Sequence, residues 1–210
     1  MTIAIALVIA MLYTTLVEYL VHRYFSHRRF SLFSWRPGVT EGLFLAHALG
    51  HHREYTGATD YVSTRAIPAR DWVNDSLLAW SHVAVLPLYL LLVFYLGPIS
   101  VLVAAAYTTF HFVIFFSILH HAQHHPHGKW WEYTSPIVAH NLHHWLHHRH
   151  QNRNFSVTIP IFDYLFFTKA RPSAEERALF MTMMRTRLEG TAHARAVYGP
   201  TDADRENHRK

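Results

Sequence analysis

Histidine is the residue type in this sequence with the greatest capacity for chemistry. Twenty of the 210 residues are histidines, and the neutral imidazole nitrogen is a common ligand for transition metals. Sixteen of the twenty fall into four groups of two, three, five and six, in the ranges 22–27, 47–52, 120–127 and 140–150. The chain has no cysteine, which excludes thiolate metal sites and iron–sulfur clusters. Nitrogen and oxygen atoms must therefore hold any metal bound here.

The spacing within three of these groups is that of one helix face. Residues three or four apart on a helix lie on the same side, so their imidazoles can converge on one ion. Doubled histidines add a ligand about 100° further round, so one helix could serve two neighbouring metals. Eight to ten such histidines exceed what one metal needs, which argues for two. The pairs with this spacing are His47/His51, His120/His124 and His144/His148, and His144/His147 comes close to it.

The first group differs, because His22 and His27 are five residues apart and do not share a face of a regular α-helix. We therefore expect the helix to end between them. Glu18 lies one turn before His22 and is the only acidic residue in an apolar run, where an ionisable group is costly unless it is functional or paired. We expect Glu18 to act as an outer partner that orients the imidazole of His22.

Apolar runs predict the helices that must position these histidines. Thr2 to about Val21, Leu77–Leu96 and Ile99–Leu119 are each long enough to cross ~30 Å of hydrocarbon as a helix. Residues 97–98, Gly-Pro, join the second and third runs in a tight hairpin. Val39–Leu49 is apolar but too short to span, which predicts a re-entrant or interfacial helix. The sequence thus predicts an all-α integral membrane bundle of about three spanning helices plus this shorter one.

The basic residues predict how the bundle is oriented. Seven arginines lie in the range 23–75, and further lysines and arginines follow the third run, whereas none precedes the first run or lies at the hairpin. The positive-inside rule places these two basic regions, and with them a histidine-rich helical cap, in the cytoplasm. The net charge of +5 is not gathered into a Lys/Arg-rich run, so we expect no nucleic-acid partner.

The four groups and their order resemble the fatty acid hydroxylase superfamily, which includes sterol desaturases, sterol methyl oxidases and sphingolipid fatty-acid 2-hydroxylases. Its pattern is H-x3–4-H, H-x2–3-HH, H-x3-H and H-x2-HH, followed by an Asn-aromatic-Gly, an Asp and an aromatic-Gly-Thr end. This chain has Asn154-Phe155-Ser156, then Phe162-Asp163 and Phe166-Phe167-Thr168, and the resemblance covers roughly Glu18–Thr168. It implies as metal ligands His22, His27, His47, His51, His52, His120, His124, His144, His147 and His148.

The chain departs from the family pattern at several points. Ser156 and Phe167 stand where glycines are expected, and the second box has the longer x3 spacing. Four further histidines leave the ligand set open: His121/His125 could replace His120/His124, and His140 or His143 could also contribute.

The resemblance implies a di-iron centre that uses dioxygen to oxidise an unactivated C–H bond of a lipophilic substrate such as a fatty acyl lipid, a sterol or a related lipid. Zinc is the alternative metal of the purified protein. The chain has no cytochrome b5 domain, so electrons from NAD(P)H would arrive through a separate carrier, either cytochrome b5-like or a ferredoxin with its reductase. Residues 1–170 would form this membrane-embedded hydroxylase/desaturase-like domain. Residues 171–210 would form a polar C-terminal tail, with a helix over Ser173–Leu188 and disorder in the last twenty residues.

Two other functions remain open from the sequence. One is a lipid desaturase or a carotenoid hydroxylase, which use similar histidine boxes. The other is a histidine-rich membrane protein that carries or senses zinc.

Overall fold

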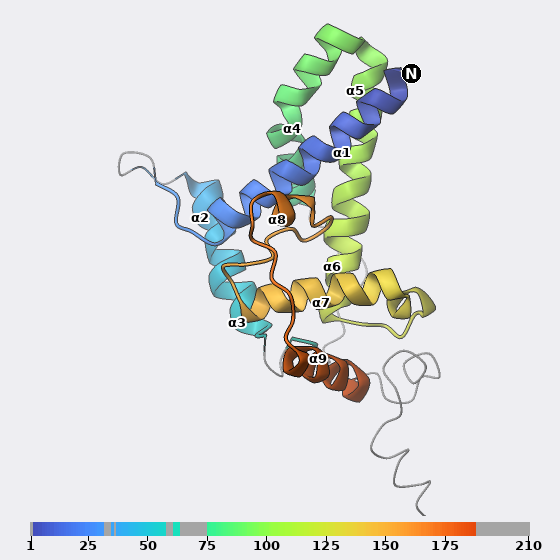
Figure 1. Cartoon of the computed structure of the whole chain (residues 1–210). Helices are drawn as coiled ribbons and strands as arrows, with labels where there is room; N and C mark the ends of the chain where they lie inside the picture. Colours follow the sequence, from blue (N-terminus) through green and yellow to red (C-terminus); the bar gives the residue numbers. More distant parts are fainter. Residues whose placement is uncertain (1, 32–34, 36, 58–60, 64–74, 188–210) are drawn as a thin grey trace, which may run out of the picture.

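The computed structural model describes residues 2–31, 35, 37–57, 61–63 and 75–187. These residues are mainly helical, with no β-strand among them. The long helices α1, α4 and α5 form one end of the molecule, and α7 and α9 lie at the other end (Figure 1).

Three helices are long and apolar enough to cross a membrane. The first joins α1 (Thr2–Leu20) to a π-helical turn, η1 (Val21–Ser26). The second is α4 (Asp75–Leu96), and the third joins α5 (Pro98–Phe110), η4 (His111–Leu119) and α6 (His120–His124) without a break. The three predicted spans are confirmed as helices. The first and third continue beyond the predicted ends, so His22 lies on the first helix and His120, His121 and His124 lie on the third.

The bundle is apolar outside and packs through small residues inside. Side chains that point outward are large and apolar, including Leu90, Phe94 and Leu102, which is the arrangement expected of a surface that faces lipid. Helix α1 packs against α5 through buried small residues, which allow close approach of the two backbones. These are Ala6, Ala10 and Thr14 on α1, and Ser100, Ala104 and Thr108 on α5.

The hairpin between α4 and α5 forms as the sequence predicts. Gly97 has φ 84°, a left-handed conformation that glycine adopts without a steric penalty. Pro98 occupies the first turn of α5, where its missing N–H costs no hydrogen bond.

The short apolar stretch after residue 37 is also helical. It runs as α2 (Gly38–Phe44), a second π-helical turn η2 (Leu45–His51) and α3 (His52–Glu54). Its position relative to a lipid bilayer stays a prediction.

Helix α7 (Ser135–Arg149) carries the fourth histidine group and crosses the end of the bundle (Figure 1). A short 3-10 turn, η5 (Trp130–Tyr133), precedes it, and α8 (Ile161–Leu165) follows. The face of α7 that carries Trp145 and Leu146 packs on α9 (Ala174–Arg187). There these two side chains contact Phe180 and Met184 in a buried apolar cluster.

Helix α9 begins within one residue of the predicted C-terminal helix and continues to Arg187, the last described residue. Ser173 and Glu176 form a reciprocal capping box at its start. The last twenty residues, predicted to be disordered, lie outside the described residues.

Candidate metal centre

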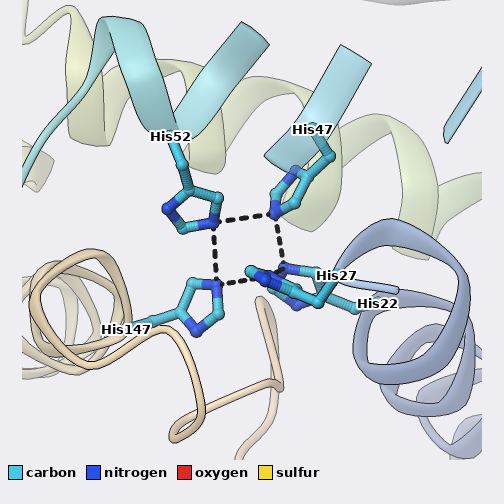
Figure 2. Close-up of side chains that lie close together, drawn as sticks. All are labelled: His22, His27, His47, His52 and His147. Carbon is cyan, nitrogen blue, oxygen red and sulfur yellow. Dashed lines mark hydrogen bonds between the residues drawn. The ribbon is translucent and has the colours of Figure 1, made fainter. Parts of the chain in front are cut away.

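Nine of the ten predicted ligands lie in two groups whose ring nitrogens could each hold a metal ion. The first, the five-histidine group, gathers side chains from the end of the first helix, from η2 and α3, and from α7. Its members are His22, His27, His47, His52 and His147. Figure 2 shows their rings pointing toward one another.

The five Nε2 atoms form a closed ring (Figure 2). No carboxylate belongs to this group, so all of its donor atoms are imidazole nitrogens. The Nε2–Nε2 distances around the ring are 2.8 Å (His22–His47), 3.0 Å (His47–His52), 3.1 Å (His52–His147), 3.0 Å (His147–His27) and 3.1 Å (His27–His22).

The second, the four-histidine group, consists of His51, His124, His144 and His148. Its Nε2 atoms form a chain, with 3.2 Å between His51 and His148 and 3.1 Å between His148 and His144. His144 and His124 are also 3.1 Å apart. The tenth predicted ligand, His120, is not a member, but its ring lies 4.6 Å from that of His144. Its buried Nε2 has no hydrogen-bond partner among the described residues.

The two groups are adjacent. The rings of His52 and His148, one from each group, have centroids 4.3 Å apart. Helix α7 contributes His147 to the first group and His144 and His148 to the second. A single helix therefore serves both groups, as the doubled histidines predict, and the two groups could hold two metal ions side by side.

The pairing within the sequence motif His47/His51/His52 differs from the prediction. His47 and His51 share no group, although they are four apart: His47 joins His52, five residues on, and His51 turns to the other group. The backbone there is the π-helical turn η2, whose wider turn brings residues five apart toward one side.

The same geometry explains the first box. Helix η1 is also a π-turn and ends at Ser26, so the helix does end between His22 and His27, as the sequence predicts. The wider turn then brings the two imidazoles together, with Nε2 atoms 3.1 Å apart.

Backbone carbonyls set the protonation of several of these imidazoles. A carbonyl oxygen only accepts, so each Nδ1 that contacts one must carry the proton and leave Nε2 with a bare lone pair. The Nδ1–H of His22 donates to Phe155, and that of His147 donates to Arg153 at 2.7 Å. In the second group, His124 donates to Tyr61 at 2.8 Å and His148 donates to Tyr55.

Burial keeps the imidazoles outside the spanning helices neutral. Burial, followed by the neighbouring His22 and His52, lowers the pKa of His27 to about 2. Burial and His22 lower the pKa of His52 to about 3. Burial and adjacent histidines also hold the pKa values well below 6.5 for His47, His51, His144, His147 and His148.

Neutral imidazoles cannot satisfy these contacts by themselves. Each carries one N–H, and His22 and His147 use theirs on carbonyls, so at most three protons remain for the five contacts around the first ring. A cation resolves the conflict, because it attracts every lone pair at once. The donor set fits a divalent transition metal in each group: all-imidazole sites suit iron, copper, nickel or zinc.

The predicted direct contact between Glu18 and the imidazole of His22 does not form. The carbonyl of Phe155 occupies that place, while the Glu18 carboxylate accepts from His111 Nε2 at 2.7 Å and from the backbone N–H groups of Val157 and Thr158. His111 is thus a buried partner of Glu18. The sequence could not show this contact, because the residues involved are 93 to 140 positions apart.

The four histidines left open by the sequence have other neighbours. His125 Nε2 lies 2.8 Å from the Tyr55 hydroxyl, and its ring stacks on that of His121. His140 accepts from Gln123, and His143 donates to the carbonyl of Ser156 at 3.1 Å. None of the four belongs to either metal-binding group.

An apolar cavity of about 750 Å³ reaches both groups. Its walls come from α1 and η1, α2, α4 and η4, with side chains such as Val17, Leu43, Trp80, Phe112 and Phe116. Histidines of both groups line it as well: His22 and His47 from the first, His51 from the second, and the adjacent His120.

Comparisons of the chain with family models, curated proteins and solved structures found no match. The geometry of the site therefore carries the functional argument.

Proposed function

We propose that this protein is a membrane-bound, non-haem di-iron oxygenase of the fatty acid hydroxylase type. It would hydroxylate a lipophilic substrate, such as a fatty acyl lipid, a sterol or a related lipid, at the cytoplasmic face of the membrane. The histidine boxes and the two adjacent all-imidazole groups support this proposal.

One observation carries the proposal beyond metal binding. The apolar cavity is lined both by histidines of the two groups and by side chains of the helices that could span a membrane. A metal carrier or sensor needs no apolar cavity of this size beside its ions, whereas an enzyme that oxidises lipids must bring an apolar chain to them.

In this proposal, the histidines and the cavity walls have different roles. The histidines hold the two irons, and the cavity walls bind the apolar substrate and exclude water from the site. Bound iron supplies the activation of dioxygen and the oxidation of the C–H bond. In the net reaction, R–H, O₂, two electrons and two protons give R–OH and water, and a separate carrier delivers the electrons from NAD(P)H. Zinc has no redox chemistry and would support none of this.

The decisive experiment measures metal and product together. Protein expressed with iron and purified in detergent is expected to hold two irons per chain, and lipids of the host membrane should gain one oxygen that derives from ¹⁸O₂. Loss of two hydrogens would instead identify a desaturase. Stoichiometric zinc, with no altered lipid after iron reconstitution, would overturn the oxygenase proposal in favour of metal handling.

A matched pair of glycines in α2 tests the cavity. Gly42 lines it and Gly38 does not. Among the described residues, a Cβ at either position meets no atom within 4 Å other than its chain neighbours and the backbone of its own helix. We expect Gly42→Leu to fill part of the cavity and to lower turnover at least ~10-fold with metal content unchanged. Gly38→Leu should retain wild-type turnover. Equal turnover in the two variants would contradict the assignment of this cavity to the substrate.

A further inference from the structure

The segment Arg153–Thr158 forms one wall of the five-histidine group. Its carbonyl groups point at α7 and at the end of the first helix: Arg153 accepts from His147, and Phe155 accepts from His22. A third carbonyl, that of Ser156, accepts from His143. This segment therefore orients two of the five imidazoles of the group.

Two buried carboxylates hold the other edge of the segment. Asp163 accepts from the N–H groups of Phe155 at 2.8 Å and Ser156 at 2.9 Å, one on each carboxylate oxygen. Glu18 accepts from the N–H groups of Val157 at 2.7 Å and Thr158 at 3.1 Å, both on Oε1. Four consecutive backbone N–H groups thus end on two carboxylates, one from α8 and one from α1.

Both carboxylates are themselves fixed in place. Asp163 is fully buried and also accepts from the Thr168 hydroxyl at 2.7 Å. Burial opposes its ionisation, yet hydrogen bonds from His143, Thr168 and the Ser156 backbone lower its pKa to about 2, so it remains a carboxylate at neutral pH. The second oxygen of Glu18 lies 2.7 Å from His111 and 2.5 Å from the Thr158 hydroxyl.

We propose that Asp163 and Glu18 are positioning residues for the five-histidine group, acting through the backbone of residues 153–158. They hold the N–H edge of this segment, so that its carbonyls fix the tautomer and direction of His22 and His147. The four-histidine group relies on the carbonyls of Tyr55 and Tyr61 instead. The inference rests on the proposed metal binding of both groups and not on the lipid chemistry.

The two carboxylates are expected to differ in how they tolerate an amide. Both oxygens of Asp163 face backbone N–H groups, which cannot become acceptors, so Asp163→Asn places an NH₂ against a donor. In Glu18→Gln the amide oxygen can keep the two backbone bonds, while its NH₂ meets the Thr158 hydroxyl and His111, which can both accept. Glu18→Leu retains none of these bonds.

The test is a double-mutant comparison of bound Fe(II) per chain. The single variants His51→Ala and His147→Ala each disable one group, so that Fe(II) binding to the other group can be measured by itself. We expect Asp163→Asn to weaken Fe(II) binding roughly 10- to 100-fold in the His51→Ala background, and to change nothing in the His147→Ala background. Glu18→Leu should behave like Asp163→Asn, and Glu18→Gln should restore binding.

The outcomes separate the inference from the proposed function. Wild-type protein that binds no Fe(II) would overturn the proposed function. Two irons in the wild type, with Asp163→Asn and Glu18→Leu both harmless in the His51→Ala background, would overturn only the positioning role. Equal losses of bound Fe(II) in the two backgrounds would also overturn the positioning role, because they would indicate a general loss of structure. If the circular dichroism of Asp163→Asn shows that its helices are lost, Fe(II) binding by Glu18→Leu and Glu18→Gln in the same two backgrounds tests the positioning role instead.

Discussion

The five-histidine and four-histidine groups share helix α7 and the stretch 45–52, but they are supported by different parts of the chain. In the first group, the supporting carbonyls belong to Arg153 and Phe155, which follow α7. In the second, they belong to Tyr55 and Tyr61, which follow α3. The first group also uses the end of the first spanning helix, through His22 and His27, whereas the second uses the end of the third, through His124.

This difference indicates that each histidine group has its own outer support although the groups share α7 and the stretch 45–52. Helix α7 and the stretch 45–52 donate imidazoles to both groups, so a large movement of either would disturb both. The carbonyls of Arg153 and Phe155 accept from imidazoles of the first group, and those of Tyr55 and Tyr61 accept from imidazoles of the second. Substitutions in imidazoles or supports should therefore affect the two positions separately.

The largest difference between the two groups is expected from variants that each remove one imidazole from one group. His147→Ala removes a member of the five-histidine group, and His51→Ala removes a member of the four-histidine group. We expect each variant to bind about one Fe(II) where the wild type binds two, and to lose activity at least ~100-fold because both ions are needed. Metal analysis with lipid mass spectrometry measures both effects. Full activity in either variant would remove that histidine from the ligand set, provided that membrane insertion is unchanged.

A smaller effect is expected from the support of the four-histidine group. The Tyr61 hydroxyl donates to the side-chain oxygen of Asn141 at 2.7 Å and so fixes the residue whose carbonyl orients His124. Tyr61→Phe should lower stability by about 1 kcal/mol, since a buried acceptor loses its donor. It should weaken Fe(II) binding a few-fold in the His147→Ala background, where only the four-histidine group remains. An equal weakening in the His51→Ala background would show that the two supports are not independent.

The smallest effect is expected at a histidine outside both groups. His150 follows α7, is partly exposed and lies 2.7 Å from Glu176 of α9. Its replacement by alanine should change the free energy of unfolding by less than about 1 kcal/mol, as for other exposed contacts between polar side chains, and should leave iron content at the wild-type value. Loss of iron from this variant would mean that the position of α7 relative to α9 controls the metal centre.

The sequence by itself determines which side chains are available and on which helices they lie. Apolar runs of sufficient length predict the three long helices, and histidine spacing predicts sites on the helix ends and on α7, because both depend on local periodicity. The ten predicted histidines are the ones that the fold brings together, nine of them in the two groups and His120 beside the second.

Only the tertiary structure decides how those histidines are sorted. The π-turns at η1 and η2 bring residues five apart together, so His47 lies in the same group as His52 and His51 lies in the other group. Sequence spacing read as a regular α-helix cannot show this. The partners of Glu18 depend in the same way on distant packing: Val157 and Thr158 lie about 140 residues along the chain and reach its carboxylate only after α7 and α8 have folded against the bundle. Local periodicity predicts which helices carry clustered histidines, and long-range contacts decide how these histidines are grouped, which of them donate to carbonyls and which residues support them.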